Sequence, residues 1–392
     1  MPMPNQTILV LLSGALWNDS RVLRISKTLS KDYAVTVLAY MGKPSNISAP
    51  FKVHEMKKGV GLSNKILSRS YFWLPFHRDV HTQFDLSKNY DLIWANDLNT
   101  LYTGAFLAKK MNAKLIYDSH EIYVETINQF FPTNTTGLKK AFHKWNCKLM
   151  QSLGKRMEAK YSMQASHIFT ANESFSEILK EKYHWKRVTS LYNLPVYQES
   201  SNRSLKQNIR DTFTPNEIIV LYHGMFNAGR GLHLVIQAMQ YLKLDYKLVM
   251  LGSGFLKAEL TDFAKKLNVT NRVVFMEMVP EAELIGFIKG ADVGINLLEK
   301  VNISKWNASP NKLFQYIHAG IPVVCSKSPE NIKAFEKYAM GELVNNTPES
   351  IATGIEAINN NLQAKSGLGA AAKYFSWDSE EKKLLAIMGS IF

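Results

Sequence analysis

Short runs of apolar and β-branched residues alternate with helical periods along most of the chain. In the first half the runs fall at 8–13, 34–40, 92–96, 114–118, 167–171 and 188–192, and in the second half near 217–223, 246–251, 272–277, 293–298 and 322–325. Strands that alternate with helices form parallel sheets whose two faces are covered by helices. The pattern therefore predicts an α/β fold with a parallel sheet in each half.

A polar and nearly aperiodic stretch at 195–216 separates the two halves and predicts an interdomain linker. The chain has 392 residues, more than one hydrophobic core usually supports. We therefore expect one domain over 1–194 and a second over 217–376. Ligands of open α/β sheets bind beyond the carboxyl ends of the strands, so two facing sheets place the active site in the cleft between the domains.

A helix followed by a buried strand is predicted in the last third of the chain. Ser309 suits the N-cap position, Pro310 suits the first helical position, and Gly320 supplies a left-handed stop before the strand. The free backbone N–H groups near Asn311 and Lys312 then point out of the loop at the strand end. A helix N-terminus of this kind favours a phosphate group.

A second strand, loop and helix lie upstream of this one. The strand ends at His223-Gly224, and the loop Asn227-Ala228-Gly229-Arg230-Gly231 leads into the next helical pattern. Arg230 places a cation in this loop. Two loops of this type in one domain can bind a diphosphate from both sides.

These motifs make the C-terminal half resemble nucleotide-sugar-dependent glycosyltransferases of the GT-B fold, close to the retaining family 4 (group 1). The matching stretches are His-Gly-x5-Arg-Gly at 223–231, Gly252-Ser253-Gly254 after a strand, Val279-Pro280-x-x-Glu283-Leu284 continuing to Ala291-Asp292-Val293, and Pro-Asn-Lys-Leu-Phe-x-Tyr-x-x-Ala-Gly-x-Pro-Val-Val ending at Val324. Their order over 217–325 makes the resemblance specific. It implies two Rossmann-like domains that face a cleft, and a final helix within 377–392 that crosses back to the first domain.

The resemblance assigns the donor site to the loops of the C-terminal domain. Arg230 stands where the family usually carries a Lys that pairs with the donor diphosphate, and a guanidinium can hold two phosphate oxygens at once. The Arg that normally follows the first Gly of this loop is replaced by Met225, and Lys312 and Lys257 are the cations available to compensate. The residues expected to bind the donor are Gly224, Arg230, Gly252, Val279, Asn307, Asn311, Lys312, Leu313 and Gln315.

His120 ends a strand of the first half and matches the place where the family has a histidine beside the donor sugar. The resemblance gives this histidine the task of hydrogen-bonding the sugar and favouring the charge that develops at the anomeric carbon. Together with Arg230 it forms the expected catalytic pair. The acceptor is expected to bind at Ser13, Gly14, Asp19, Arg21 and Asp97.

Two carboxylates that the family spaces with seven residues between them fall on Asn307 and Gln315, which are amides here. The Gln315 carbonyl oxygen can still accept hydrogen bonds from a donor ribose, and Glu299 is a nearby carboxylate that could approach the site. In retaining enzymes of this fold the leaving diphosphate itself is thought to accept the acceptor proton, so a protein nucleophile is not required. No Asp-x-Asp motif occurs, and neither a metal nor another cofactor is expected.

The net charge of +14 is unevenly distributed. Residues 1–200 contain 26 Lys and Arg against 15 Asp and Glu, and the remainder contains 21 against 18. The basic residues gather at 57–78, interleaved with aromatic residues such as Trp73 and Phe76, and again at 139–160. Basic residues beside aromatic ones suit an anionic membrane surface. No helix-turn-helix, zinc-finger or RNP-type motif accompanies them, so nucleic acid is not an expected partner.

Cys147 and Cys325 are too few and too far apart for a disulfide framework or a zinc site, which indicates a reducing compartment. The apolar run 8–12 follows no Lys or Arg and is better explained as a first strand than as a signal peptide. No apolar stretch reaches the roughly 18 residues that cross a bilayer. We therefore expect a cytoplasmic protein, peripheral at the inner face of the cytoplasmic membrane.

The function implied is a retaining glycosyltransferase that moves a sugar from a nucleotide-sugar donor to a glycan or lipid-linked acceptor in cell-surface polysaccharide synthesis. The alternative is a catalytically silent domain of the same fold that binds nucleotide sugar or glycan as a partner subunit. The two amides and Met225 favour the silent domain, whereas His120 and Arg230 oppose it. A nucleotide-sugar epimerase of the same fold would require additional carboxylates in the cleft.

Overall fold

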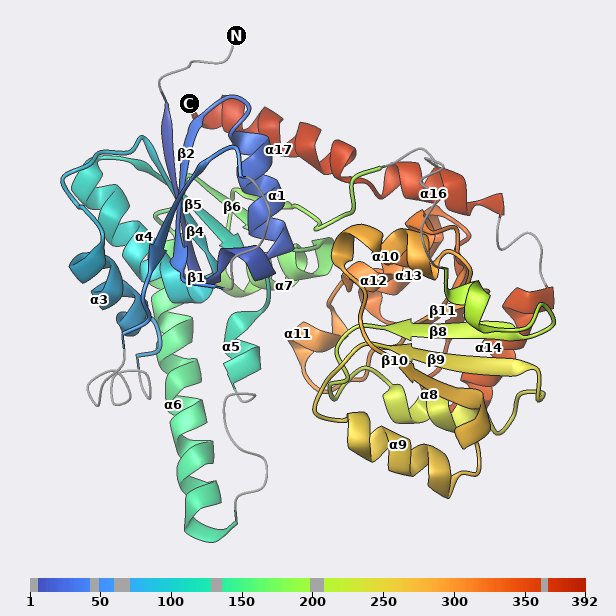
Figure 1. Cartoon of the computed structure of the whole chain (residues 1–392). Coiled ribbons are helices and arrows are strands. Elements are labelled where there is room, and N and C mark those ends of the chain that lie inside the picture. The colour runs from blue at the N-terminus through green and yellow to red at the C-terminus, as the bar shows by residue number, and fades with distance from the viewer. Residues whose placement is uncertain (1–5, 43–48, 60–70, 128–135, 198–207, 361–365) are drawn as a thin grey trace. The chain divides into compact units, whose positions relative to one another are not determined.

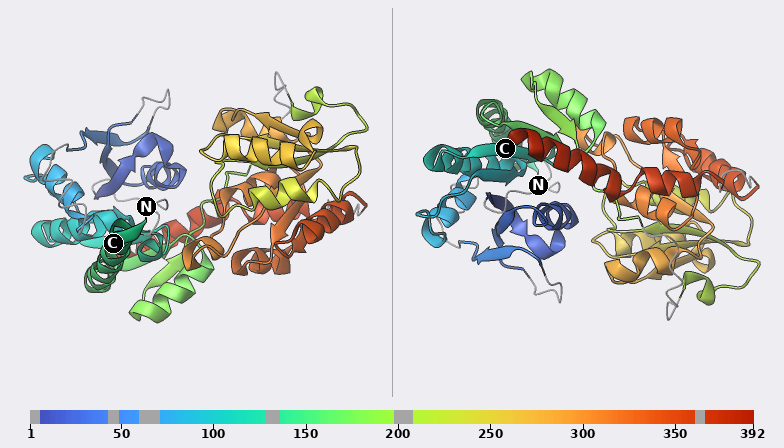
Figure 2. Two further views of the ribbon diagram at one scale, coloured as in Figure 1. Left: turned by 90° about the horizontal axis from the view of Figure 1, so that it is seen from below. Right: turned by 90° about the horizontal axis from the view of Figure 1, so that it is seen from above.

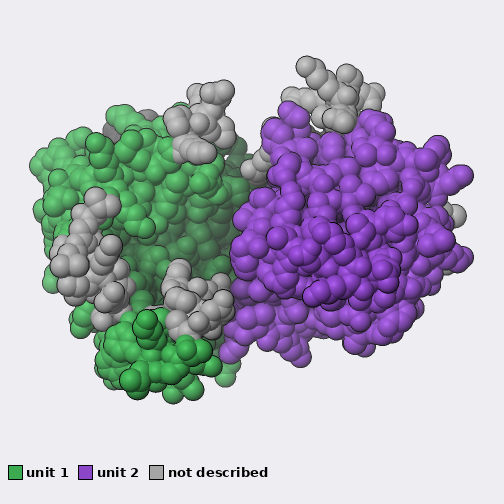
Figure 3. Space-filling view, turned by 60° about the horizontal axis from the view of Figure 1, so that its bottom comes forward, with its two compact units in different colours: residues 1–193, 381–392 green, residues 194–380 purple. Residues whose placement is uncertain are grey.

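The computed structural model describes residues 6–42, 49–59, 71–127, 136–197, 208–360 and 366–392, which fold into two compact α/β units (Figures 1 and 3). Unit 1 comprises Met1–Asn193 and Glu381–Phe392, and unit 2 comprises Leu194–Glu380. Residues 198–207 of the expected linker lie outside the described residues, and Ile209–Thr212 form a short 3-10 helix. The domain bounds expected from the sequence stay predictions.

Unit 1 contains a seven-stranded sheet in the order β3-β2-β1-β4-β5-β6-β7, in which all neighbouring strands run parallel. The strands are β1 (Thr7–Ala15), β2 (Ala34–Tyr40), β3 (Lys52–Met56), β4 (Leu92–Asn96), β5 (Lys114–Ser119), β6 (His167–Thr170) and β7 (Val188–Ser190). Its helices are α1 (Ser20–Leu29), α3 (Leu74–Gln83), α4 (Asp97–Met111), α5 (Tyr123–Thr126), α6 (Gly137–Ser162) and α7 (Glu173–Tyr183). The central strand β4 is buried at all five positions, as expected for a parallel strand covered on both faces.

Unit 2 contains a six-stranded parallel sheet in the order β10-β9-β8-β11-β12-β13. The strands are β8 (Ile218–His223), β9 (Tyr246–Leu251), β10 (Val273–Met276), β11 (Val293–Asn296), β12 (Val323–Ser326) and β13 (Gly341–Val344). The helices are α8 (Leu232–Ala238), α9 (Lys257–Lys266), α10 (Glu281–Ile288), α11 (Ile303–Trp306), α12 (Asn311–His318), α13 (Pro329–Lys337), α14 (Pro348–Asn360) and α16 (Leu368–Tyr374). Side chains from β8, β9, β11 and helices α8, α9 and α14 form one continuous core.

The two parallel sheets confirm the predicted α/β fold, and the apolar runs mark all strands except β3 and β13. Both missed strands are at sheet edges. β3 has a single fully buried residue, Met56, and β13 likewise has only Val344. A strand paired on one side only can carry polar residues, so its sequence lacks the apolar run that marks a central strand.

The helix predicted to follow β11 begins later than expected. α12 begins at Asn311, its N-cap is Pro310 in an extended conformation (ψ 133°), and no side chain caps it. The prediction that Ser309 caps this helix is therefore wrong. Gly320 has φ +74°, which confirms the left-handed stop. The uncapped start leaves backbone N–H groups available at the carboxyl end of β11.

The final helix forms as α17 (Trp377–Ile391). Its residues from 381 onward contact unit 1: Lys31 Nζ donates to Glu381 Oε1 at 2.6 Å, Thr28 Oγ1 donates to the same oxygen at 2.9 Å, and Phe392 stacks on Tyr33 with ring centroids 5.2 Å apart. Figure 2 shows these last turns, in red, as part of unit 1. Among the described helices, none is both long and apolar enough to span a membrane.

Candidate active site

The loops that follow β8 and β9 touch through their backbones. The Phe226 N–H donates to the Ser253 carbonyl at 2.7 Å, and the Gly224 N–H donates to the Leu251 carbonyl at 2.9 Å. A Cβ on Gly252, which has φ +151°, would lie 2.0 Å from the Gly224 carbonyl oxygen. Only glycine fits there. The structure thus brings together the two glycines that the sequence assigned to the donor site.

Arg230 lies in a loop that the segment after β11 holds in place. The Gly231 N–H donates to Glu299 Oε2 at 3.1 Å, and the Gly229 carbonyl accepts the Glu299 N–H at 3.1 Å. A Cβ on Gly231, at φ +63°, would lie 2.6 Å from the Leu297 Cβ. The half-buried Arg230 makes no hydrogen bond or ion pair with any residue that the structure describes. Glu299 therefore positions this loop, a role that the sequence did not reveal.

Lys312 is a buried cation in the first turn of α12. Its Nζ lies 3.7 Å from the centre of the Tyr222 ring, and a Cβ on Gly224 would lie 3.7 Å from the same Nζ. Only 9% of the residue is exposed, and no described carboxylate pairs with it. Burial, together with the charge of Arg230, holds the Lys312 pKa well below its usual range. A buried charge without a counter-ion is costly, so this site is suited to an anion.

Tyr316 ties α12 to the end of β8. Its hydroxyl donates to the Leu221 carbonyl at 2.8 Å and accepts the His223 N–H at 3.1 Å. Its ring covers Gly294, where a Cβ would lie 2.6 Å from the ring carbons. This anchor sets the position of Lys312 on the preceding turn of α12. The role of Tyr316 was not predicted, although a tyrosine in an apolar helix after a Gly-containing strand is a usable signal.

The remaining donor residues predicted on α11 and α12 occupy different surroundings. Asn311 is exposed at the start of α12, and Leu313 is buried behind it. Gln315 is half-buried, and its side chain makes no hydrogen bond with the described residues. Asn307 follows α11, where its Nδ2 donates to the Ile303 carbonyl at 2.9 Å. Asn307 is therefore already engaged in ending a helix, whereas the Gln315 amide is available to a ligand.

Two further predictions concern the neighbouring loops. Val279 is half-buried in the loop between β10 and α10, at the same edge of the sheet. Lys257 begins α9, and its Nζ donates to Glu277 Oε1 at 2.6 Å. This exposed ion pair occupies the Lys257 ammonium, whereas the buried Lys312 has no carboxylate partner among the described residues. That Lys312 compensates for Met225 stays a prediction.

In unit 1, His120 lies between two carboxylates at the ends of β4 and β5. Its Nδ1 is 3.4 Å from Asp97 Oδ2, and its Nε2 is 3.3 Å from Asp118 Oδ2 in an ionic contact. The His120 backbone N–H also donates to Asp97 Oδ1 at 3.0 Å. Asp97 has φ +60°, an uncommon conformation for a residue with a side chain. The structure therefore brings His120 and Asp97 together as the sequence implied, and adds Asp118.

Arg21, in the first turn of α1, also belongs to this cluster. It is 4% exposed and binds Asp118 through two nitrogens, at 3.1 Å from Nε and 2.6 Å from Nη2, while Nη1 donates to the Leu191 carbonyl. The guanidinium is thus committed inside unit 1. The sequence predicted that Arg21 binds the acceptor. Its side chain is buried and fully bonded, so it has no group left for a ligand and instead supports Asp118.

The other predicted acceptor residues lie at the end of β1. Ser13 and Gly14 are the two positions before Ala15, the last residue of β1, and they lie at an irregularity in its pairing with β2 and not in the following loop. Asp19 caps α1, because its Oδ1 accepts the Val22 N–H at 2.9 Å. The half-buried Ser13, Gly14 and Asp19 share the carboxyl-end edge of the sheet with Asp97.

The charge on His120 should make the stability of unit 1 depend on pH. Burial lowers the His120 pKa, but Asp97 and Asp118 outweigh that effect and raise it from 6.5 to about 9. The charged His120 therefore stabilises unit 1 fully below pH 6.5, and this stabilisation is lost as the pH rises through about 9. We expect the difference in unfolding free energy between wild type and His120→Asn to shrink by roughly 3 kcal/mol as the pH rises from 6.5 to about 9. Urea unfolding across the pH range measures this, and parallel profiles would contradict it.

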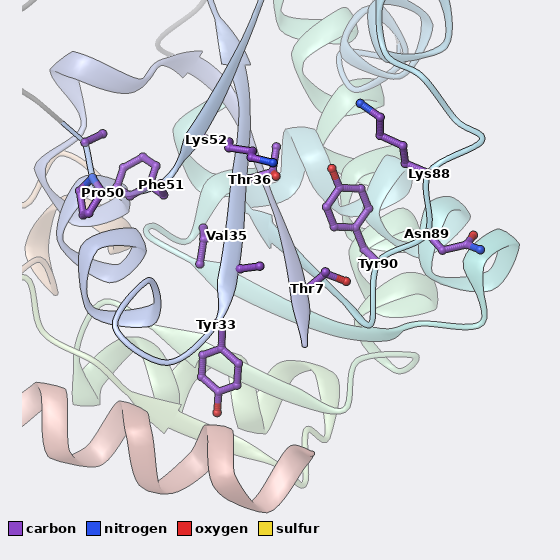
Figure 4. A pocket seen from close by; sticks show the side chains of 12 residues that line it. Thr7, Tyr33, Val35, Thr36, Pro50, Phe51, Lys52, Lys88, Asn89 and Tyr90 are labelled. Carbon is purple, nitrogen blue, oxygen red and sulfur yellow. The ribbon is translucent and has the colours of Figure 1, made fainter. Parts of the chain in front are cut away.

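A pocket of about 680 Å³ in unit 1 lies at the opposite edge of the sheet (Figure 4). Its lining includes Thr7, Tyr33, Lys52 and Tyr90, which stand at or just before the amino ends of β1 to β4. Ligands of parallel sheets bind at the carboxyl ends. This pocket is therefore separate from the candidate site.

Comparisons with known proteins agree with this arrangement. Residues 206–374 match the family described as glycosyl transferases group 1. Two uncharacterised glycosyltransferases of Methanocaldococcus jannaschii are 26% identical over 166 residues (41% of this chain, 38% of that protein) and 22% identical over 315 residues (76% and 75%). The chain therefore spans well under half of the first relative and three quarters of the second.

A shorter match is to the N-acetylgalactosamine-N,N'-diacetylbacillosaminyl-diphospho-undecaprenol 4-alpha-N-acetylgalactosaminyltransferase of Campylobacter jejuni. It is 33% identical over 92 residues, which are 23% of this chain and 24% of that enzyme. The residues matched are too few to transfer a substrate.

Solved structures match over nearly the whole chain. Sucrose-phosphate synthase from Thermosynechococcus elongatus has a TM-score of 0.72 at 14% identity, covering 99% of each chain. HepE from Anabaena, in complex with UDP and glucose, has a TM-score of 0.69 at 16% identity, covering 98% of this chain and 100% of HepE. At such identities the likeness shows the fold. The chain thus has the GT-B fold, and its residues 206–374 match the model of the glycosyl transferases group 1 family.

Proposed function

We propose that this chain transfers a sugar from a nucleotide-sugar donor to a glycan or lipid-linked acceptor, with retention of anomeric configuration. The observation that carries the proposal is the buried Lys312 ammonium, which has no carboxylate partner among the described residues and lies beside the loop of Arg230. The uncapped start of α12 adds backbone N–H groups to the same place. A donor diphosphate would supply the missing counter-charge.

The same three groups would assist departure of the leaving group. As the bond from the anomeric carbon to the diphosphate oxygen breaks, negative charge grows on the diphosphate. Arg230, Lys312 and the α12 N-terminus are fixed before the reaction by Glu299 and Tyr316, so they can stabilise that charge without reorganising. In this scheme the departing diphosphate accepts the proton of the acceptor hydroxyl. A protein base is then unnecessary, which is compatible with amides at Asn307 and Gln315.

In unit 1, we assign the exposed part of the carboxylate cluster to the sugar. The Asp97 side chain is 28% exposed, that of His120 is 15% exposed, and that of Asp118 is fully buried. Both ring nitrogens of His120 already face carboxylates. Asp97 is therefore the better placed of the three to accept a hydrogen bond from a sugar hydroxyl, with His120 as its positioning residue. Ser13, Gly14 and Asp19 remain the proposed acceptor residues.

Two relatives support the choice of substrates. The solved structure of HepE contains UDP and glucose, which makes a uridine diphosphate sugar the first donor to test. The name of the Campylobacter jejuni enzyme describes an acceptor linked through diphosphate to undecaprenol, which makes a polyprenyl-diphosphate glycan the first acceptor. Both are proposals for this chain.

The second candidate function is a silent binding domain, and the exposed Met225 with the amides Asn307 and Gln315 favours it. A thermal-shift screen with UDP, GDP, ADP and CMP sugars identifies the donor first. Turnover of that donor, including slow hydrolysis to free sugar, then separates the two candidates. Tight donor binding without turnover on any acceptor mixture would favour the silent domain.

The variant Gln315→Glu should keep donor affinity and turnover within about threefold of wild type, because either side chain offers an oxygen to a ribose hydroxyl. The matched variant Asn307→Glu should be more disruptive, since the Asn307 amide donates to the Ile303 carbonyl and a carboxylate cannot. Steady-state kinetics with the identified donor measures both. A loss of binding in Gln315→Glu beyond tenfold would contradict the role of Gln315 as a ribose acceptor.

A further inference from the structure

The helix α6 is anchored to unit 1 by its residues from Asn146 onward. Glu158 accepts the Tyr117 hydroxyl and the Tyr183 hydroxyl, each at 2.7 Å, and Gly154 packs near Phe72 and Val124. By contrast, residues 137–145 are exposed at every position except the half-buried His143. Figure 1 shows this half of the helix running past the other elements of unit 1. We call residues 137–148 the α6 tip.

Three large apolar side chains line one face of the α6 tip. Leu138 is 90% exposed, Phe142 is 54% exposed and Trp145 is 60% exposed. Their spacings of four and three residues place them in one row along the helix. Phe142 and Trp145 lie with ring centroids 6.1 Å apart. Trp145 is the one exposed tryptophan among the seven in the chain, all of which are described.

Unpaired lysines surround this apolar row. Lys139 and Lys148 fall on its two flanks at 100° per residue, and Lys140 and Lys144 lie on the face behind. None of the four forms a hydrogen bond or ion pair with a residue that the structure describes. The helix contains seven Lys and Arg but a single acid, the buried Glu158. The α6 tip therefore combines exposed apolar area with uncompensated positive charge.

The other basic segment, 57–78, does not share these properties. Its Trp73 and Phe76 are buried in unit 1, and Lys65 and Arg69 lie outside the described residues. The expectation that aromatic residues of this segment face a membrane is therefore wrong for Trp73 and Phe76. Their burial follows from the packing of α3 against the sheet, where aromatic side chains fill the core.

We propose that the α6 tip docks on an anionic lipid surface, with Leu138, Phe142 and Trp145 inserted among the headgroups and the flanking lysines paired with lipid phosphates. A helix with one aromatic and leucine face and a lysine-rich remainder is suited to lie in the plane of such an interface. Lysine stems can extend along the apolar boundary while the ammonium reaches the headgroups. The inference goes beyond the proposed function and can be tested without any donor.

The full-length protein should sediment with vesicles of phosphatidylglycerol and phosphatidylcholine, and not with phosphatidylcholine alone. Phe142→Ser/Trp145→Ser should lower the partition coefficient at least about tenfold, because it removes the inserted rings. Lys139→Gln/Lys148→Gln should lower it by about tenfold and flatten its dependence on salt. The matched controls Leu244→Ser, which is 76% exposed in unit 2, and Lys109→Gln/Lys110→Gln, exposed on α4, should bind as wild type does.

The emission of Trp145 provides a direct readout of insertion. It should shift to shorter wavelength on vesicles and be quenched by brominated acyl chains, and the change should be absent in Trp145→Phe. Unaltered circular dichroism and nucleotide binding in all variants would show that unit folding and the donor site are intact. Binding that ignores lipid charge or survives Phe142→Ser/Trp145→Ser would overturn the proposal. The proposal would also be overturned if sedimentation velocity showed a wild-type dimer that is monomeric in Phe142→Ser/Trp145→Ser, because the apolar row would then be a protein interface.

Discussion

Replacing Lys312 with methionine should weaken nucleoside diphosphate binding by at least about tenfold while it stabilises unit 2. The ammonium is buried without a carboxylate partner, so the unliganded fold carries a desolvated charge that methionine removes. A gain of roughly 1–3 kcal/mol in unfolding free energy is expected. The bound state instead loses a charge-assisted bond worth roughly 1.5–3 kcal/mol. Calorimetry with UDP, or with the nucleotide chosen by the screen, and urea unfolding measure the two effects.

Arg230→Met provides the matched comparison. It should weaken binding to a similar degree but leave stability within about 0.5 kcal/mol, because Arg230 is only half-buried and has no partner to lose among the described residues. Lys257→Met, which breaks the exposed pair with Glu277, should change neither quantity appreciably. If Lys312→Met binds nucleotide as tightly as wild type, the diphosphate does not lie at the α12 N-terminus.

The depressed pKa of Lys312 adds a readout of its own. Binding of a diphosphate restores the counter-charge and raises the Lys312 pKa toward its usual value, so binding should be coupled to proton uptake at pH values between the free and the bound pKa. Calorimetry in buffers of different ionisation enthalpy measures this uptake. It should be absent in Lys312→Met and retained in weakened form in Arg230→Met.

Replacing Asp118 with asparagine should destabilise unit 1 by roughly 3–5 kcal/mol, because it leaves the buried Arg21 guanidinium without its counter-charge. His120 loses one of its two carboxylates in the same step, and its pKa should fall from about 9. Urea unfolding measures the loss of stability, and NMR titration of the imidazole measures the pKa. Hydrogen exchange at the β5 amides localises the effect to unit 1.

The control for this prediction is Asp262→Asn, which breaks the exposed pair with Lys265 at 3.1 Å. That change should cost less than about 1 kcal/mol. Arg21→Met/Asp118→Asn should be less destabilising than the single Asp118 variant, since it removes both members of the buried pair. A single variant as stable as the Asp262 control would contradict the view that Arg21 and Asp118 support the cluster.

The sequence by itself determined the parts of this protein that depend on local properties. Apolar runs identified the central strands of both sheets, because a strand buried on both faces needs apolar residues throughout. Gly320 was recognised as a left-handed stop, and its φ of +74° confirms this. Gly224 and Gly252 were named from the family motifs. The family of the C-terminal half followed from the order of these motifs. Lys312 and Arg230 were named from the sequence as candidate donor-site cations, and that role stays a prediction.

Tertiary structure alone decided which charges are compensated. Arg21 and Asp118 are 97 positions apart in the chain and became a buried pair, whereas Lys312 was left without a carboxylate. Glu299, 68 positions from Gly231, became the residue that holds the Arg230 loop. Sequence shows each charge but not its neighbour, because neighbours are set by which strands pair and how helices pack on them. The energy of a charge in a protein depends on that neighbour and on burial, and both arise only when distant segments meet.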